Sequence, residues 1–272
     1  MSSPKTIVIT GASAGIGAAF AQRLAHDGHN LVLAARGLPD LHRVASDCEG
    51  AGAPRAISVA ADVRDREQVA AVAAAAVDAV RGFDVWINNA GRGIDKSVLD
   101  LSGDDFDEIM AVNTKSALYG SQVAAAHFLD RGHGHIVNIS SFLGRVPLAP
   151  HRSAYNAAKA ALNAVTANVR VELHTRNPAI HVTLFMPGMV ATDFAKNAKY
   201  APAGATSYAG PHVQTADQVA EILADVIAHP VAEVYTNPAS ADMARRYFED
   251  VGAFEQGGGN PWQNRPPSGG GR

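Results

Sequence analysis

A tyrosine and a lysine, Tyr155 and Lys159, stand four residues apart in the alanine-rich run SAYNAAKAAL. Residues at this spacing share one face of a helix, so the phenol and the ammonium could meet at a common site. An ammonium about 4 Å from a phenolate, at an effective dielectric near ~20, stabilises it by about 4 kcal/mol and lowers the phenol's pKa by roughly three units before desolvation opposes it. Such a phenol could act as a general acid or base near neutral pH. Taken alone, the spacing is more typical of an ordinary surface pair on a helix.

A second candidate site is the turn GASAGIG, which directly follows the apolar run TIVIT and precedes a helical stretch. Without side chains, Gly11, Gly15 and Gly17 would let backbone N–H groups approach a pyrophosphate, and the helix would present the positive end of its dipole to the same anion. The spacing G-x-x-x-G-x-G differs from G-x-G-x-x-G, but it occupies the same first strand-turn-helix unit. The turn therefore predicts a nucleotide site, in which Ser13 and Ile16 are further candidates, and a purely structural turn is the minor alternative.

The end of the second apolar run, NLVLAARG, indicates which dinucleotide would bind. An NAD site commonly places an acidic side chain here, on the ribose 2′-hydroxyl. Instead, Ala35 leaves room for a 2′-phosphate, and Arg36 could pair with it through two parallel hydrogen bonds. NADP(H) is therefore the favoured cofactor, and NAD(H) is the alternative if Arg36 is only a solvated loop residue. Further candidate contacts follow the third and fourth runs, although each could be a plain turn residue: Asp62, Asn89, Ala90 and Gly91.

Short apolar runs alternate with amphipathic, alanine-rich stretches along the chain. Continuous apolar runs suit strands that are covered on both faces, and helical connections imply parallel pairing with right-handed crossovers. The alternation therefore predicts an α/β, doubly wound Rossmann fold. The expected helices cover approximately residues 15–27, 38–50, 65–81, 104–129, 153–176 and 215–228.

The length of 272 residues suits one large domain, which we expect over residues 1–254. Residues 188–214 lose periodicity and mix proline, glycine and aromatic residues, as a lid or substrate loop does, although a plain surface excursion has the same composition. Residues 255–272 are rich in glycine and proline and cannot bury enough surface to fold by themselves, so we expect a tail.

Charge and cysteine content argue against several classes of partner. A net charge of −3 and a pI near 6.4 give no basic field for a nucleic-acid backbone. The N-terminal apolar run is too short for a signal sequence or a membrane span. Cys48 is the single cysteine, so no internal disulfide can form, which suits the cytoplasm, and we expect an exposed or half-buried thiol without function. The 11 histidines include no H-E-x-x-H pattern, and we predict no metal site.

Several motifs occur in a fixed order between about Lys5 and about Asn237: TGASAGIG, DV at 62–63, NNAG at 88–91, Asn113, IVNISS, YNAAK and PGMVAT. In these motifs the chain resembles the short-chain dehydrogenase/reductase family. The resemblance implies a seven-stranded Rossmann sheet and a catalytic tetrad, which maps onto Asn113, Ser141, Tyr155 and Lys159. Ser141 is preferred to Ser140 because it matches the second serine of the family's S-S-x-x-G pattern, here completed by Gly144.

The resemblance also implies roles for other residues. Asp62 and Val63 would border the adenine, and Asn89 and Gly91 would line the cofactor. Asn113, an awkward residue inside a helix, would anchor a water that relays protons to Lys159. The last motif would meet the nicotinamide, through Pro187, Gly188, Val190 and Thr192. Helices similar to those over residues 113–129 and 155–173 pair between subunits in many relatives, so a homo-oligomer, either a dimer or a tetramer, is implied.

These features predict an NADP(H)-dependent oxidoreductase that interconverts a ketone or aldehyde and an alcohol by hydride transfer, with Tyr155 as general acid or base. Arg145 or Arg152 could bind an acidic substrate, although we expect both to be exposed to solvent. The alternatives are an NAD-dependent alcohol dehydrogenase and a non-catalytic nucleotide-binding regulator. Apolar residues nevertheless favour a hydrophobic or aromatic small molecule: Phe142, Leu143, Val146, Met189, Phe194, Tyr200 and Tyr208.

Overall fold

A seven-stranded, all-parallel sheet forms the centre of the protein, in the strand order β3-β2-β1-β4-β5-β6-β7. The computed structural model describes residues 4–210 and 212–256. The predicted doubly wound fold is confirmed, and the strand order reverses between β1 and β4, where ligands bind in open α/β sheets. The strands are β1 (Thr6–Thr10), β2 (Asn30–Ala35), β3 (Ala56–Ala60), β4 (Val85–Asn88), β5 (Gly134–Ile139), β6 (Ile180–Met186) and β7 (Glu233–Tyr235).

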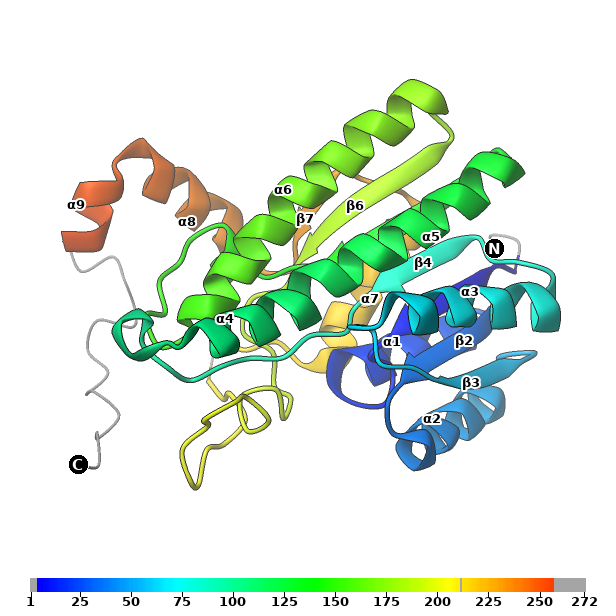
Figure 1. Ribbon diagram of the computed structural model, residues 1–272, viewed down its shortest axis with the longest axis horizontal. Coiled ribbons are helices and arrows are strands. Elements are labelled where there is room, and N and C mark those ends of the chain that lie inside the picture. The colour runs from blue at the N-terminus through cyan, green and yellow to red at the C-terminus, as the bar shows by residue number, and fades with distance from the viewer. Residues whose placement is uncertain (1–3, 211, 257–272) are drawn as a thin grey trace.

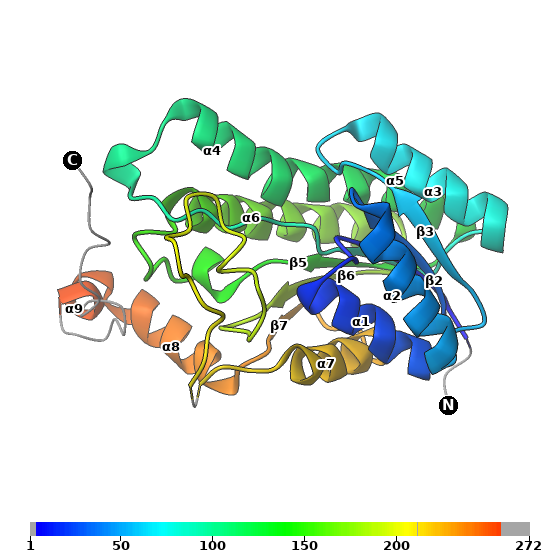
Figure 2. The same ribbon diagram turned by 90° about the horizontal axis from the view of Figure 1, so that it is seen from below.

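Helices cover both faces of the sheet (Figures 1 and 2). One layer contains α1 (Gly15–His26), α2 (Leu38–Ala51) and α7 (Ala216–Ala228), and the other contains α3 (Arg66–Val80), α5 (Ser116–Arg131) and α6 (Ser153–Arg176). Successive side chains of a strand point to opposite faces. Ile7 and Ile9 therefore join the core beneath α1 and α2, whereas Val8 joins the core on the other side. This double burial explains why the strands read as continuous apolar runs.

The helix predicted over residues 104–129 is interrupted. It consists of α4 (Gly103–Met110), a π-helical turn over Ala111–Lys115, and α5. In the π turn, the Ser116 N–H donates to the Ala111 carbonyl, one residue further back than in an α-helix. The sequence prediction missed this break because hydrophobic periodicity hardly changes over a single turn.

Two helices near the C-terminus were not predicted, α8 (Pro238–Glu249) and α9 (Val251–Gln256). The start of α8 carried a usable signal, because Asn237 caps the Ala239 N–H and Pro238 occupies the first turn. The expected tail was to begin at residue 255, but α9 continues through Gln256. Residues 257–272 lie outside the described part of the chain.

The expectation for Cys48 was wrong, because its side chain is fully buried. It lies on the inward face of α2 with Leu41, Val44 and Ala45, at helical spacing. Burial raises the pKa of the Cys48 thiol to about 12, so it has little thiolate character. Within residues 4–210 and 212–256, no helix is long and apolar enough to cross a membrane.

Candidate active site

The glycine turn between β1 and α1 packs tightly against the end of β4. A Cβ atom at Gly11, where φ is +66°, would lie 2.7 Å from the Ala90 Cα, and one at Gly17 would lie 2.3 Å from the Gly11 carbonyl oxygen. The Asn89 side-chain amide donates to the Thr10 carbonyl at 3.0 Å and to the Gly11 carbonyl at 3.1 Å. Gly11, Gly17 and Asn89 therefore fix the shape of the turn.

Gly15 opens toward the other side of this turn. A Cβ there would meet, among the described residues, only the Thr192 side chain, at 3.7 and 3.8 Å. The first turn of α1 has Ala14 as its N-cap, which supplies no side-chain hydrogen bond, so the helix N–H groups keep their capacity to bind an anion. The turn and the loop after β6, which holds Thr192, thus form a cradle that fits the pyrophosphate of a dinucleotide.

Charged residues cluster where β2 and β3 end. Arg36 is exposed, as a residue that contacts a ligand phosphate can be. The Asp62 carboxylate accepts hydrogen bonds from Arg64 Nε at 3.0 Å, and these bonds, reinforced by the charge of Arg36, hold the pKa of Asp62 below its usual range. Sequence reasoning did not single out Arg64, although its place two residues after Asp62 was a possible signal. Val63 is buried beside them.

Three of the four predicted catalytic residues meet where β5 ends. Tyr155 and Lys159 are 8% and 3% exposed and occupy the first turns of α6. The Ser141 hydroxyl accepts from the Leu143 N–H at 3.1 Å and is close enough to the Tyr155 phenol to lower its pKa. The Lys159 ammonium donates to the Ile139 carbonyl at 2.8 Å and lies 5.6 Å from the centroid of the Tyr155 ring. Tyr155 and Lys159 therefore share one face of α6, as their four-residue spacing predicted, and this face is buried instead of lying on the surface.

The predicted electrostatics of this pair are wrong for the protein chain alone. Burial raises the pKa of Tyr155 to about 12, although the hydrogen bond from Ser141 opposes the shift. Burial also lowers the pKa of Lys159 to about 7. Desolvation disfavours the charged form of both groups and is the largest cause of each shift, so each net shift runs opposite to the attraction considered before desolvation. The phenol therefore keeps its proton at neutral pH.

Asn113 lies in the π turn and approaches Lys159 across Gly91. Its side-chain amide donates to the Arg92 carbonyl at 2.9 Å and to the Ile109 carbonyl at 3.0 Å. A Cβ at Gly91 would lie 2.8 Å from Asn113 Oδ1 and 3.6 Å from Lys159 Nζ, so a glycine is needed for this approach. Single π turns often occur at functional sites, which accounts for an asparagine within a long helix.

The Ser140 hydroxyl contacts α6, through the Asn163 side chain and the Lys159 backbone, so it connects the end of β5 to this helix. The hydroxyl oxygen lies 2.5 Å from Asn163 Oδ1 and 3.3 Å from the Lys159 carbonyl oxygen, and its single proton is directed to the nearer acceptor, Asn163 Oδ1. In the motif after β6, the Pro187 carbonyl accepts from the Phe142 N–H, and the Gly188 N–H donates to Thr236. Val190 is buried and pairs with Gln214 in an isolated parallel bridge. These bonds fix the backbone that carries Thr192 beside the glycine turn.

The predicted pocket residues divide into separate groups. Leu143 and Phe194 pack against Tyr155, and the Phe194 and Tyr155 ring centroids are 5.4 Å apart. Phe142 and Val146 pack with the cluster that includes Tyr247 of α8. The Tyr200 hydroxyl donates to Asp105 at 2.9 Å, and the Tyr208 hydroxyl accepts from Arg152 at 3.3 Å.

The predicted exposure of the two arginines must also be corrected. Arg152 is only 4% exposed, because it is hydrogen-bonded to Ile94 in the loop after β4 and to Tyr208 in the long loop before α7. Arg145 is partly buried and pairs with Glu233 at 2.6 Å, so its charge already has a partner.

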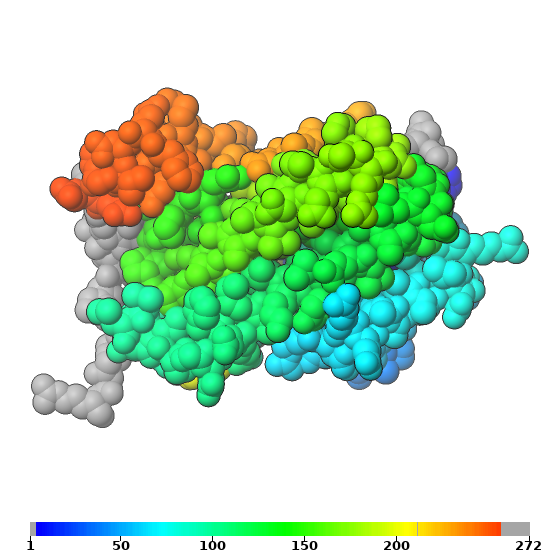
Figure 3. Space-filling model, turned by 45° about the horizontal axis from the view of Figure 1, so that its top comes forward, coloured from blue at the N-terminus to red at the C-terminus, as the bar shows by residue number. Residues whose placement is uncertain are grey.

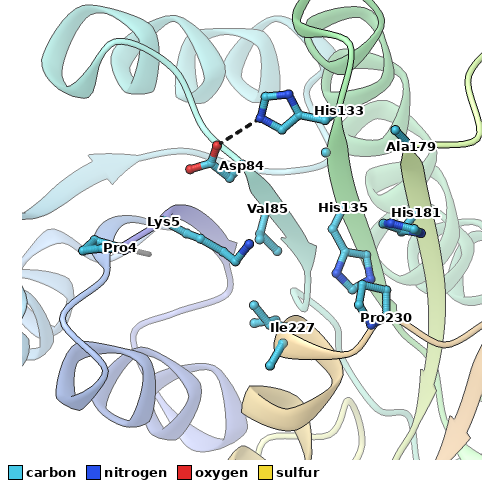
Figure 4. A pocket seen from close by; sticks show the side chains of 12 residues that line it. Pro4, Lys5, Asp84, Val85, His133, His135, Ala179, His181, Ile227 and Pro230 are labelled. Carbon is cyan, nitrogen blue, oxygen red and sulfur yellow. Dashed lines mark ion pairs between the residues drawn. The ribbon is translucent and has the colours of Figure 1, made fainter. Parts of the chain in front are cut away.

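A cavity of about 430 Å³ lies at the opposite edge of the sheet, where the strands begin (Figure 4). Lys5, His135 and His181 line it, and His133 pairs there with Asp84 at 3.7 Å. No predicted site residue lines this cavity. Within the described ranges, no three His, Cys, Asp or Glu side chains come together as a metal ion would require. The reactive residues at the other edge therefore remain the candidate active site.

Comparison with known proteins identifies the family. A family model described as short chain dehydrogenase matches residues 5–202. The chain belongs to the short-chain dehydrogenase/reductase family. This dehydrogenase/reductase is 31% identical over 241 residues to the uncharacterized oxidoreductase YxnA of Bacillus subtilis (strain 168), an alignment that covers 88% of this chain and 67% of that protein. Oxidoreductase chemistry is thus established at the level of the family.

Two solved structures from the same family resemble this protein in fold. A short chain dehydrogenase/reductase from Burkholderia phymatum in complex with NAD has a TM-score of 0.81 and 30% identity, over 92% of this chain and 94% of that one. A short-chain dehydrogenase from Sphingobium yanoikuyae in complex with NADPH has a TM-score of 0.77 and 25% identity, over 97% of this chain and 99% of that one. Solved structures with this fold thus include one in complex with NAD and one in complex with NADPH.

Proposed function

We propose that this protein interconverts a ketone or aldehyde and an alcohol by hydride transfer, with NADP(H) as its cofactor. The observation that carries the proposal is the burial of Tyr155, Lys159 and Ser141 together, with Tyr155 and Lys159 one helical turn apart on α6. They lie at the same edge of the sheet as the glycine turn. Related structures hold NAD or NADPH, which supports a nicotinamide cofactor without deciding between the two. At the end of β2 the chain has Arg36 in place of the acidic residue that commonly binds the ribose of NAD. This arginine favours NADP(H).

The residues around the cradle would hold the cofactor in three groups. Arg36 would pair with the 2′-phosphate, and Asp62 and Val63 would border the adenine. The pyrophosphate would lie against the glycine turn, with contacts from Gly11, Ser13, Gly15, Ile16 and Gly17. The nicotinamide end would lie among Asn89, Ala90, Gly91, Tyr155, Lys159, Pro187, Gly188, Val190 and Thr192.

A bound nicotinamide supplies or accepts the hydride, and the chain's own residues manage the proton. Burial raises the pKa of Tyr155 and keeps it protonated at neutral pH, so its proton would pass to the carbonyl oxygen only as that oxygen becomes an alkoxide, a stronger base than the phenolate. The Ser141 hydroxyl can donate a hydrogen bond to the same oxygen as negative charge develops on it. Lys159 would orient the ribose, and Asn113 would connect it to a proton supply. With a pKa of about 7, Lys159 can exchange protons at neutral pH.

Other features of the proposal concern the whole chain. Residues 1–254 would form one catalytic domain, with residues 188–214 as a substrate lid. Hydrogen bonds support an ordered loop, since the Lys199 N–H donates to the Gly93 carbonyl and the Asp95 N–H donates to the Lys199 carbonyl. We expect a small-molecule carbonyl or alcohol substrate, a cytoplasmic location, and a homo-oligomer assembled through the outer faces of α5 and α6.

The decisive experiment replaces Tyr155 with phenylalanine. We expect Y155F to bind NADPH normally while its kcat falls about a hundredfold to ten-thousandfold, because the proton donor is lost. NADPH oxidation in the presence of a panel of ketones and aldehydes measures turnover, and fluorescence titration measures binding. Tyr119→Phe, a half-buried tyrosine on α5, is the matched control. Equal turnover by wild type and Y155F would contradict the mechanism, and NADPH binding without any turnover would favour a nucleotide-binding regulator.

Cofactor choice depends on Arg36. We expect Arg36→Ala to raise the KM for NADPH by about tenfold or more and to change the KM for NADH little, because only NADPH carries the 2′-phosphate. Arg43→Ala, on the exposed side of α2, is the control. An unchanged ratio of the two KM values would remove Arg36 from the site.

A further inference from the structure

Arg152 is a buried arginine at the start of α6, three residues before the reactive Tyr155. Its Nη1 donates to the Ile94 carbonyl at 3.1 Å, and its Nη2 donates to the Tyr208 hydroxyl at 3.3 Å. Its Nε is sealed from solvent and has no hydrogen-bond partner among the described residues. One edge of the guanidinium is therefore incompletely satisfied.

The charge of Arg152 is also uncompensated. Within residues 4–210 and 212–256, no carboxylate forms an ion pair with it. By contrast, two nearby arginines each pair with a glutamate, Arg92 with Glu108 and Arg145 with Glu233. Taking a charge out of water without a partner is expensive, and buried charges in proteins are ordinarily paired. A buried guanidinium with neither a counter-charge nor a full set of acceptors is the arrangement that an anionic ligand would complete.

Arg152 and the reactive phenol are connected through Gly93 and Phe194. A Cβ at Gly93 would lie 3.2 Å from Arg152 Nη1 and 3.0 Å from the Phe194 ring, and that ring lies 5.4 Å from the Tyr155 ring. The charge of Arg152 lowers the pKa of Tyr155, although burial dominates the shift, so the two side chains interact electrostatically. A ligand that contacts both groups would span a short distance.

We propose that Arg152 binds a carboxylate of the substrate, so that the protein acts on an oxo acid or the corresponding hydroxy acid. The inference rests on the proposed function. Nε and Nη2 lie on one edge of the guanidinium, and their spacing matches the two oxygens of a carboxylate. The Nε atom is covered in the structure, so binding at this edge would require a displacement of the segment from residue 191 to 210, which contains no helix and no strand. Phe194 and Leu143 would contact the apolar part of the same molecule.

The wild-type enzyme tests the proposal directly. Acetoacetate, levulinate and benzoylformate would each be compared with its methyl ester, with NADPH and with NADH, because esterification removes the charge and keeps the ketone. We expect kcat/KM for at least one acid to exceed that for its ester by about tenfold to a hundredfold, the effect of hydrogen bonds to a charged group. The proposal is overturned if every ester is turned over as well as its acid.

Variants locate the effect at Arg152. In Arg152→Gln the ratio of kcat/KM for acid over ester should fall to about one, and Arg152→Lys should keep part of the preference because it retains the charge but loses the paired donors. Arg145→Gln is the matched control and should keep the wild-type ratio, since Arg145 already pairs with Glu233. If folded R152Q loses acid and ester turnover equally, Arg152 is only a structural contact and the inference fails. The wild-type comparison remains decisive should either variant fail to fold.

The two proposals fail in different ways. If neither these acids and esters nor the panel of ketones and aldehydes is turned over with either cofactor, the proposed function is contradicted and the inference with it. If the panel is turned over but none of the three acids is, only the carboxylate site is contradicted. If esters and acids are turned over equally, the oxidoreductase proposal stands and only the carboxylate site is lost.

Discussion

At the scale of single residues, desolvation controls the proton chemistry of the site. Lys159 is 3% exposed, and burial lowers its pKa from 10.5 to about 7. Between these two values the unfolded chain binds a proton that the folded protein does not bind, so stability rises with pH across this window. Below pH 7 both states are protonated, and the burial of the charge costs at most roughly 5 kcal/mol. A residue kept at this cost is consistent with function and not with stability.

Replacement of this lysine should remove the penalty. We expect Lys159→Met to be more stable than the wild type at about pH 6, with a difference that shrinks as the pH approaches 10, where the unfolded lysine also becomes neutral. Urea unfolding across that range measures the effect. Lys115→Met, at an exposed position of the π turn, should keep the wild-type profile. A K159M curve parallel to that of the wild type would mean that Lys159 stays charged in the folded protein.

The sequence could name candidate site residues, but it could not give the environment of each one. The spacing of Tyr155 and Lys159 and the order of the glycine turn depend only on neighbours in the chain. The pKa values depend on burial by segments far away, such as the strand end at Ile139. For the same reason, a single sequence could not indicate that Arg152 is covered by the segment holding Tyr208.

At the scale of elements, one buried carboxylate ties the predicted lid to α4. Asp105 accepts from Lys96 Nζ and Lys199 Nζ, each at 2.8 Å, and from the Tyr200 hydroxyl at 2.9 Å. Tyr200 has a φ of +61°, a conformation that non-glycine residues seldom adopt and that this hydrogen bond helps to hold. The two lysines hold the pKa of Asp105 well below its usual range, with Lys199 contributing most.

Loss of this charge should loosen the lid. We expect Asp105→Asn to increase the rate of trypsin cleavage after Lys196 or Lys199 by about tenfold, because the open form of the segment becomes more populated. Limited proteolysis followed by mass spectrometry reads out the site and the rate. Asp107→Asn, an exposed position on the same helix, should cleave like the wild type. Unchanged cleavage in D105N would show that other contacts hold the segment.

Elements with strong periodicity were predicted well, and those defined by tertiary contacts were not. The helix predicted over residues 153–176 matches α6, and each predicted apolar run contains a strand. By contrast, the π turn is held by the approach of Asn113 to Arg92, which local periodicity does not encode. The short α9 is held by the burial of Phe254. This side chain packs against Tyr247 of α8 and against Val146, which is far away in the sequence.

At the scale of the whole molecule, the alternation of apolar runs and helices determines a doubly covered sheet, since each parallel strand needs a crossover helix to bury it. The sequence pattern does not predict assembly with further copies in the same way, because an exposed surface in one chain does not reveal which partner covers that surface. In Figure 3, α5 and α6, coloured green, run side by side across the surface with no other element of the chain over them. The outward line of α6 contains Ala157, Ala160, Ala164 and Val171, with one polar residue among them, Asn168.

A second copy of the chain would fit this face, because small residues let helices approach closely and Val171 is 67% exposed in the single chain. We expect Ala164→Arg to raise the dissociation constant of the homo-oligomer by about a hundredfold or more, since the new charge would be buried between subunits. Light scattering coupled to size-exclusion chromatography measures the mass. Ala74→Arg, on the exposed side of α3, adds the same charge elsewhere and should leave assembly unchanged. A wild-type protein that is monomeric at micromolar concentration, or an A164R variant that assembles like the wild type, would exclude α6 as the interface.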